Sequence, residues 1–197
     1  MSNRTATVWL AVCLVIVFLY EVAAGAAGSE AALLPLGALR TRGWSAIDSW
    51  RILTFSFLHL NALHLMLNIA GLYWLGGILE RRVGARGMLA AFAAGGLMSG
   101  VAGMLLGPFL PTTGIAVGAS GAVFGLLAAA LVITLRDDGK QGERNRRLRV
   151  VLTICLIAGV VMSFLPGVSL AGHIGGLAGG ALVAAVGPQL DVRARGS

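Results

Sequence analysis

Charged side chains are scarce in this sequence of 197 residues, since Asp, Glu, Lys and Arg together make up 12% of it. Soluble globular domains carry roughly 25% charged residues. Hydrophobic residues make up 57%, so the chain cannot cover a folded surface with polar groups. This shortage excludes an ordinary soluble protein and predicts an integral membrane protein with a single domain over residues 1–197.

Cysteine and histidine are also rare, with two and three residues respectively. Cys13 and Cys155 both fall inside apolar runs, where cysteine acts as a small packing residue, so no disulfide framework is expected. The histidines have no Cys or Asp clustered around them, which makes a poor ligand set for a metal ion. We therefore expect neither a metal site nor a cofactor.

Long apolar runs dominate what is present. Most approach the ~20 residues that cross ~30 Å of hydrocarbon, which predicts an all-α membrane protein with six transmembrane helices. The first run also resembles a signal peptide, but its ~19 apolar residues exceed the usual hydrophobic core of one, which favours an uncleaved span. The six runs cover residues 9–27, 62–79, 87–107, 120–135, 150–165 and 170–187.

The net charge of +7 is unevenly divided between the two sets of loops. One side holds only Arg40, Arg42 and Arg51. The positive-inside rule places the richer side in the cytoplasm, together with both termini and the tail 188–197, and leaves residues 28–61 as an external loop. Because the cations mark cytoplasmic loops, a nucleic-acid partner is not expected. The richer side holds Arg4, Arg81, Arg82, Arg86, Arg136, Lys140, Arg144, Arg146, Arg147, Arg149, Arg193 and Arg195.

Four polar residues inside the runs are candidates for function, because polar groups in a membrane are costly. They are His64 and Asn68 in the second run, Ser120 in the fourth and His173 in the sixth. At 1.5 Å per residue, all four lie about 20–27 Å above the first cytoplasmic charge of their runs. In a ~30 Å core, this is one layer just below the outer face. No Asp or Glu is expected beside Ser120 or His173 at this depth.

Glycines recur at four-residue spacing on the fourth and sixth runs. Such stripes of small residues let two membrane helices approach closely. Ser120 Oγ is then expected within ~3 Å of a ring nitrogen of His173, where the imidazole can act as a general base. The stripes are Gly121 and Gly125 on the fourth run, and Gly172, Gly176 and Gly180, with Gly175 and Gly179, on the sixth.

Each feature also has a structural interpretation. A GASG stretch in a membrane helix serves packing more often than catalysis. A single histidine is often a hydrogen-bonded core residue, and His64 and Asn68 share one helix face from which they can bond to neighbouring helices. The segment is also not the G-x-S-x-G turn of soluble hydrolases, because residue 122 is alanine. The common depth of the polar residues favours a catalytic site over these interpretations.

With these residues in place, the sequence resembles the rhomboid family of intramembrane serine proteases. Trp50–Arg51 is similar to the family's loop motif, and His59, His64 and Asn68 match its H-x-x-x-x-H-x-x-x-N pattern. The matching segments recur in order between residues 50 and 180. The others are GGILERRVG at 76–84, GASGAVFG at 118–125 and AGHIGGLAGG at 171–180.

The resemblance implies a role for each matching residue. Ser120 is the implied nucleophile and His173 the implied base, as a dyad without a carboxylate. His64, Asn68 and the backbone N–H of Ser120 would hold the oxyanion, and Gly118 would leave room for the substrate carbonyl. Phe124 stands where many members carry a tyrosine stacked on the catalytic histidine. Structural roles are implied for Trp50, Arg51, His59 and Glu80.

The resemblance further implies an endopeptidase in the plasma membrane of a bacterium, in the six-span form of the family, that cleaves single-span membrane proteins near the outer face. Three alternatives stay open. A catalytically silent relative that binds helices, similar to derlins, would lack the serine or histidine. A variant similar to rhombosortases would process C-terminal sorting tails. A small channel or transporter would be expected to have a midplane site and an inverted repeat, and the sequence shows neither.

Overall fold

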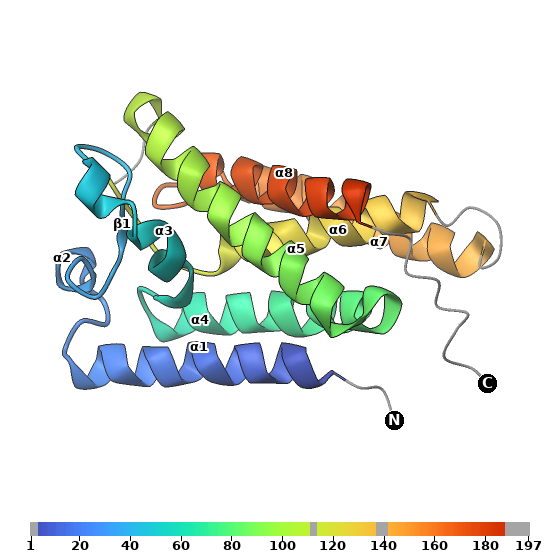
Figure 1. The fold of residues 1–197 in the computed structure, drawn as a ribbon, viewed down its shortest axis with the longest axis horizontal. Coiled ribbons are helices and arrows are strands. Elements are labelled where there is room, and N and C mark those ends of the chain that lie inside the picture. Colours follow the sequence, from blue (N-terminus) through green and yellow to red (C-terminus); the bar gives the residue numbers. More distant parts are fainter. Residues whose placement is uncertain (1–3, 111–113, 137–141, 188–197) are drawn as a thin grey trace.

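The computed structural model describes residues 4–110, 114–136 and 142–187, which form a helical bundle (Figure 1). The expected tail 188–197 and the cation Lys140 lie outside these residues. A π-helical turn, Leu72–Gly76, joins α4 (Ala62–Gly71) to α5 (Gly77–Leu106). The long helices are α1 (Thr5–Ala23), α4 (Ala62–Gly71), α5 (Gly77–Leu106), α6 (Ser120–Arg136), α7 (Gly142–Met162) and α8 (Leu170–Val186).

Helix α5 is broken at Gly84, whose φ of 74° and ψ of 174° are not helical. Few residues other than glycine adopt this conformation. The chain therefore leaves α4, continues through the π turn to residue 83, and returns across the bundle in residues 85–106 (Figure 1). The two apolar runs expected at 62–79 and 87–107 are thus separate segments, although the first extends beyond its expected end.

Helix α1 occupies residues Thr5–Ala23, four residues earlier than the expected run 9–27. At its end, Ala26 N–H donates to Glu21 O, and Gly25 N–H, with φ 68°, donates to Val22 O. This pattern is a Schellman motif, which terminates helices at glycine. At its start, the carboxylate of Glu80 accepts hydrogen bonds from the N–H groups of Ala6 and Thr7.

The segment expected as an external loop, residues 28–61, is largely structured. It includes α2 (Glu30–Leu33), β1 (Leu39–Arg40), α3 (Arg51–Thr54) and two short 3-10 turns, Ala46–Asp48 and Phe55–Phe57. Strand β1 pairs antiparallel with β2 (Ile115–Ala116), with Leu39 opposite Ala116. The all-α expectation therefore needs this small correction, which ties the segment to the chain that leads into α6.

Arg51 holds the segment 28–61 together. Its guanidinium donates to Asp48 Oδ1 at 2.9 Å, to Ala38 O at 3.1 Å and to Leu34 O. It also lies 4.7 Å from the ring centroid of Trp50. The backbone N–H of Ser45 and the side chain of Arg51 lower the pKa of the Asp48 carboxyl. These contacts suit the structural role expected of Trp50 and Arg51.

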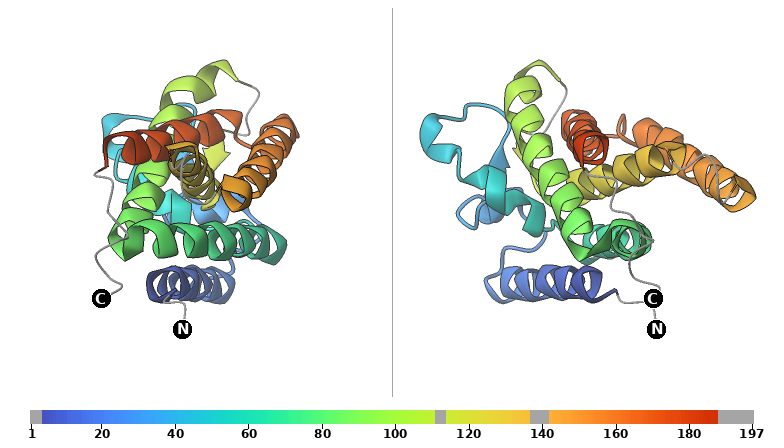
Figure 2. Two further views of the ribbon diagram at one scale, coloured as in Figure 1. Left: turned by 90° about the vertical axis from the view of Figure 1, so that its right-hand side faces the viewer. Right: turned by 45° about the vertical axis from the view of Figure 1, so that its right-hand side comes forward.

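The centre of the bundle is formed by α5, α6 and α8 (Figure 2). These helices pack closely at glycines. A Cβ on Gly176 or Gly180 would overlap backbone atoms of Gly121 or Gly125 on α6. A Cβ on Gly175 or Gly179 would overlap the backbone of α5 at Met98 or Ala94. The expected contact of the glycine stripes on the fourth and sixth runs is confirmed, and the second pair on α8 faces α5.

Helix α7 lies on the outside of the bundle, packed against α6 (Figure 2). It starts at Gly142, eight residues before the run expected at 150–165, and ends three residues early at Met162. The additional turns are charged, and Glu143 contacts Arg146 and Arg147 at 3.3 and 2.9 Å, at spacings that face each other on a helix. Its only buried side chains are Asn145 and Leu152.

Within the residues that the structure describes, two helical stretches, Thr5–Ala23 and Ala62–Phe109, are long and apolar enough to cross a membrane. The second includes the break at Gly84 and ends with the 3-10 turn Gly107–Phe109. Helices α6 and α8 are apolar but shorter, at 17 residues each.

We expect Glu80→Ala to lower the thermal stability of the detergent-purified protein. The substitution leaves the N–H groups of Ala6 and Thr7 and the hydroxyl of Thr7 without the carboxylate that now accepts from all three. Hydrogen bonds to charged groups contribute about 1.5–3 kcal/mol each. Glu80→Gln, which keeps one acceptor oxygen, should melt at a temperature between those of Glu80→Ala and the native protein.

The matched control is Glu143→Ala, because the ion pairs of Glu143 with Arg146 and Arg147 are exposed. Exposed pairs contribute about 0–1 kcal/mol, so this variant should melt close to the native protein. Equal melting of Glu80→Ala and the native protein would contradict the capping role of Glu80.

Candidate active site

Ser120 is the first residue of α6 and follows a tight turn at Gly118. Gly118 has φ 112°, and its N–H donates to Phe55 O at 3.0 Å. A Cβ on Gly118 would lie 2.6 Å from Nε2 of His64. Glycine is therefore required here both by the backbone angle and by the imidazole packed against it.

The structure brings Ser120 and His173 together. His173 lies in the first turn of α8, 7% exposed, with Nε2 2.9 Å from Oγ of Ser120. The two side chains belong to α6 and α8, the helices that approach closely at their glycines. At the start of α8, the side chain of Ser169 caps the helix by accepting from Gly172 N–H at 3.1 Å. Ser120 is half-buried, so an imidazole nitrogen and a partly accessible hydroxyl lie within hydrogen-bond distance.

Phe124 lies one turn after Ser120 and stacks on the imidazole of His173. The ring centroids are 4.1 Å apart and the planes are inclined by 11°. The other edge of the phenyl ring meets α7, where a Cβ on Gly159 would lie 2.6 Å from the Cζ atom. Stacking of this kind limits rotation of the imidazole without a hydroxyl group on the ring.

His64 and Asn68, the expected oxyanion donors, lie on α4 one turn apart. The ring of His64 packs against Gly118, two residues before Ser120. Asn68 is 5% exposed and donates from Nδ2 to His64 O at 2.9 Å. The structure therefore brings His64 to the turn before Ser120, whereas the hydrogen bond recorded for Asn68 stays within its own helix.

His59 is fully buried beside the same turn. Its Nδ1 lies 3.2 Å from Phe57 O, and its Nε2 accepts from Ala119 N–H at 3.5 Å. Its own N–H faces both carboxylate oxygens of Glu21, which is 0% exposed on α1. These contacts suit the structural role expected of His59, since they connect α1 to the residue before Ser120.

Glu21 and Ser163 lie near this site and were not among the sequence candidates. A carboxylate within the first apolar run was a usable signal for Glu21. Ser163 lies just after α7, and its Oγ is 2.6 Å from Nδ1 of His173. A serine at a helix end has many ordinary uses, so no sequence pattern distinguished it.

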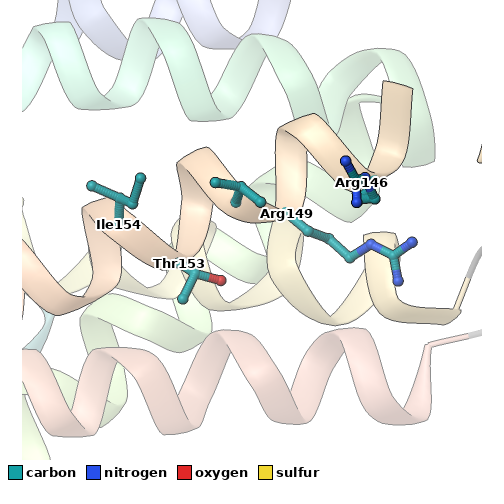
Figure 3. Close-up of a pocket in the computed structure, with 5 residues that line it drawn as sticks. Arg146, Arg149, Thr153 and Ile154 are labelled. Carbon is teal, nitrogen blue, oxygen red and sulfur yellow. The ribbon is translucent and has the colours of Figure 1, made fainter. Parts of the chain in front are cut away.

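A cavity of about 20 Å³ lies at Ser120 and His173, bordered also by Ser99 and Ser169. A space of this size has room for one water molecule. A larger open cavity of about 520 Å³ lies on α7, lined by Arg146, Arg149, Val150, Thr153 and Ile154 (Figure 3). It contains none of the candidate residues, so the smaller cavity is the candidate site.

Metal-ligating residues do not gather in the part of the chain that the structure describes: no three His, Cys, Asp or Glu side chains form a group able to hold a metal ion. The expected absence of a metal and of a cofactor stays a prediction. The polar groups that the structure places together at this site include the hydroxyl of Ser120 and the imidazole of His173.

Comparison with known proteins identifies the fold in which these residues meet. A family model described as the rhomboid domain matches residues 47–189, which include every candidate residue of the site. The chain belongs to the rhomboid family. The predicted resemblance is thus confirmed.

Several rhomboid relatives carry the name protease. The rhomboid protease GluP of Bacillus subtilis (strain 168) is 30% identical over 177 residues, 90% of this chain and 33% of GluP. Rhomboid-like protease 3 of Toxoplasma gondii is 31% identical over 181 residues, 89% of this chain and 67% of that protein. The rhomboid protease GlpG of Enterobacter sp. (strain 638) is 30% identical over 149 residues, 75% of this chain and 51% of GlpG.

The chain spans about a third of the length of GluP and about half of GlpG. What is shared with these relatives is the rhomboid domain itself, a helical membrane domain of a protease family.

We expect Phe124→Leu to slow labelling of Ser120 by a fluorophosphonate probe. Leucine fills similar volume but has no flat face to hold the imidazole at 4.1 Å, and stacked aromatic pairs contribute about 0.5–1.5 kcal/mol beyond their burial. A two- to tenfold loss of the labelling rate is the approximate result.

Phe109→Leu is the matched control, because Phe109 is 84% exposed, lies in the 3-10 turn after α5 and does not border the cavity at Ser120 and His173. It should label at the native rate. If Phe124→Leu also labelled at the native rate, the stacked ring would have no part in orienting His173.

Proposed function

We propose that this chain is an intramembrane serine endopeptidase in which Ser120 is the nucleophile and His173 the general base. The observation that carries the proposal is the 2.9 Å contact between Oγ of Ser120 and Nε2 of His173. The names of the relatives support proteolysis as the activity of the family. Hydroxyl and imidazole in this arrangement are the nucleophile and base of acyl transfer.

In the proposed reaction, His173 Nε2 takes the hydroxyl proton as Ser120 Oγ attacks the peptide carbonyl. The imidazolium then donates the proton to the leaving amine, and a water molecule repeats the sequence on the acyl-enzyme. The cavity of about 20 Å³ beside the two residues has room for that water. The side chain of Phe124 keeps the imidazole in plane for both transfers.

The negative oxygen that develops during attack needs hydrogen-bond donors. Ser120 is the first residue of α6, and the first N–H groups of a helix lack partners in that helix and carry partial positive charge. His64 packs against Gly118 at the same turn, and Asn68 lies one helical turn from His64. We assign the backbone N–H of Ser120, His64 and Asn68 to this oxyanion site.

We further propose six membrane spans with both termini in the cytoplasm of a bacterium. The six long helical segments and the excess of arginine at one set of loops support this orientation. The residues around Ser120 then face the outer side. The proposed substrates are single-span membrane proteins whose helix unwinds near that face, since an extended backbone is needed to reach Ser120.

We expect Ser120→Ala and His173→Ala to abolish cleavage of a model transmembrane substrate, with kcat/KM reduced at least about 10⁴-fold, as for nucleophile or base removal in other serine proteases. In Ser120→Ala, labelling by a fluorophosphonate probe should be lost together with cleavage. Both proteins should remain folded, because neither change adds volume to the core.

The control is Ser49→Ala, which removes an exposed hydroxyl bonded to Ala46 O and should leave activity and labelling unchanged. Turnover that survives in Ser120→Ala would rule out the nucleophile. A native protein that neither cleaves nor labels would instead favour a silent, helix-binding relative.

We expect Asn68→Ala to lower kcat by about 10²–10³-fold with little change in KM, because an oxyanion donor acts only in the transition state. Some turnover should survive on the remaining donors. The matched control is Asn61→Ala. Asn61 caps α4 by accepting from His64 N–H at 2.9 Å, so its loss should cost about 1 kcal/mol of stability without a comparable fall in kcat.

Measuring kcat and thermal stability on the same samples separates the two roles. An Asn68→Ala protein that melts earlier yet turns over normally would make Asn68 a packing residue.

A further inference from the structure

Ser163 approaches His173 from the side opposite Ser120. It follows the last residue of α7, is 2% exposed, and places Oγ 2.6 Å from Nδ1 of the imidazole. The same Oγ lies 2.7 Å from Gly159 O, one helical turn earlier. Both distances are those of hydrogen bonds, so the hydroxyl bridges the α7 backbone and the proposed base.

The direction of these two hydrogen bonds follows from the atoms involved. A hydroxyl has one hydrogen, and a carbonyl oxygen is only an acceptor. The hydrogen of Ser163 must therefore point to Gly159 O, because two oxygens 2.7 Å apart without a hydrogen between them would repel. The contact with His173 then requires the hydrogen to be on Nδ1, with Ser163 Oγ as the acceptor.

This placement decides which tautomer of His173 faces Ser120. A neutral imidazole carries one N–H, so a hydrogen on Nδ1 leaves the lone pair on Nε2. Nε2 is the nitrogen 2.9 Å from Ser120 Oγ. In the opposite tautomer, Nε2 would donate to the serine and have no capacity to accept its proton.

We propose that Ser163 is a positioning residue that holds His173 in the tautomer able to act as a base and accepts from Nδ1–H when the imidazolium forms. This inference rests on the proposed function of Ser120 and His173. Among the described residues, the side chains recorded in contact with the imidazole are Ser120, Ser163 and Phe124. Ser163 thus occupies the place that a carboxylate takes in a three-residue site.

Helix α7 and the residue after it help to position the imidazole of His173 in two ways. Gly159 makes room for the ring of Phe124, and Ser163, four residues later, binds Nδ1. Both contacts require α7 to stay packed against α6. The helix on the outside of the bundle therefore controls the orientation of a base that is carried by α8.

The test compares the full-length protein with Ser163→Ala and Ser163→Thr in detergent. The chain has three histidines, so ¹⁵N-labelled imidazoles give few signals, and His173→Ala assigns the relevant one. We expect the hydrogen of His173 on Nδ1 in the native protein and a shift towards Nε2–H in Ser163→Ala. Loss of a hydrogen bond to a charged group predicts a fall in kcat of roughly 10–100-fold with KM unchanged.

Ser163→Thr retains the hydroxyl and its bond to the preceding turn, so it should keep the Nδ1–H tautomer and most of kcat. Thr153→Ala is the matched control, because it removes an exposed hydroxyl from α7, the helix that precedes Ser163, beside the larger cavity (Figure 3). It should match the native protein in both measurements.

Several results would overturn the proposal. A native protein with the hydrogen on Nε2 contradicts it without any variant, and so does a Ser163→Ala protein with native kcat and tautomer. A fall in kcat that Ser163→Thr does not rescue, with the tautomer unchanged, would make Ser163 merely structural. Turnover in Ser120→Ala would refute the proposed function instead, and the tautomer measurement would still decide the role of Ser163.

Discussion

The close packing of α8 against α6 and α5 is the constraint on which the rest of the site depends. Gly176 and Gly180 lie where any Cβ would overlap the backbone of α6, and Gly175 and Gly179 do the same against α5. Lipid surrounds such helices with apolar groups, so they associate through packing and hydrogen bonds more than through the hydrophobic effect. Because the backbones meet, side chains at the starts of α6 and α8 reach one another, and Ser120 Oγ lies 2.9 Å from His173 Nε2.

Around this pair, buried polar groups are joined into short networks that reach the outer elements of the fold. One runs from Glu21 on α1 through His59 to the N–H of Ala119. The other runs from the backbone of α7 through Ser163 to His173. A buried polar group without a partner is costly, and more so where water is excluded. The same bonds that satisfy these groups also orient the turn before Ser120 and the imidazole that faces it.

Parts of the fold were predictable because they depend on local composition. The ends of α6 and α8 agree with the expected runs to within a residue or two, since apolar length and spacing decide them. The start of α1 was wrong by four residues, because its N–H groups are capped by Glu80 from a distant helix. The early start of α7 was missed because its first turns are charged rather than apolar, with Glu143 paired to Arg146 and Arg147.

The sequence by itself determined the class of the protein, its family and the residue types at the candidate site, because composition, apolar length and ordered motifs are properties of the chain alone. It also indicated which helices touch, since glycine stripes mark surfaces without side chains. Only the tertiary structure decided that Asn68 bonds to its own helix, that Glu21 supports His59, and that Ser163 meets Nδ1 of His173. Hydrogen bonds between distant segments depend on ångström-scale distances and on where the single hydrogen of a hydroxyl points, and neither is encoded in the spacing of residues along the chain.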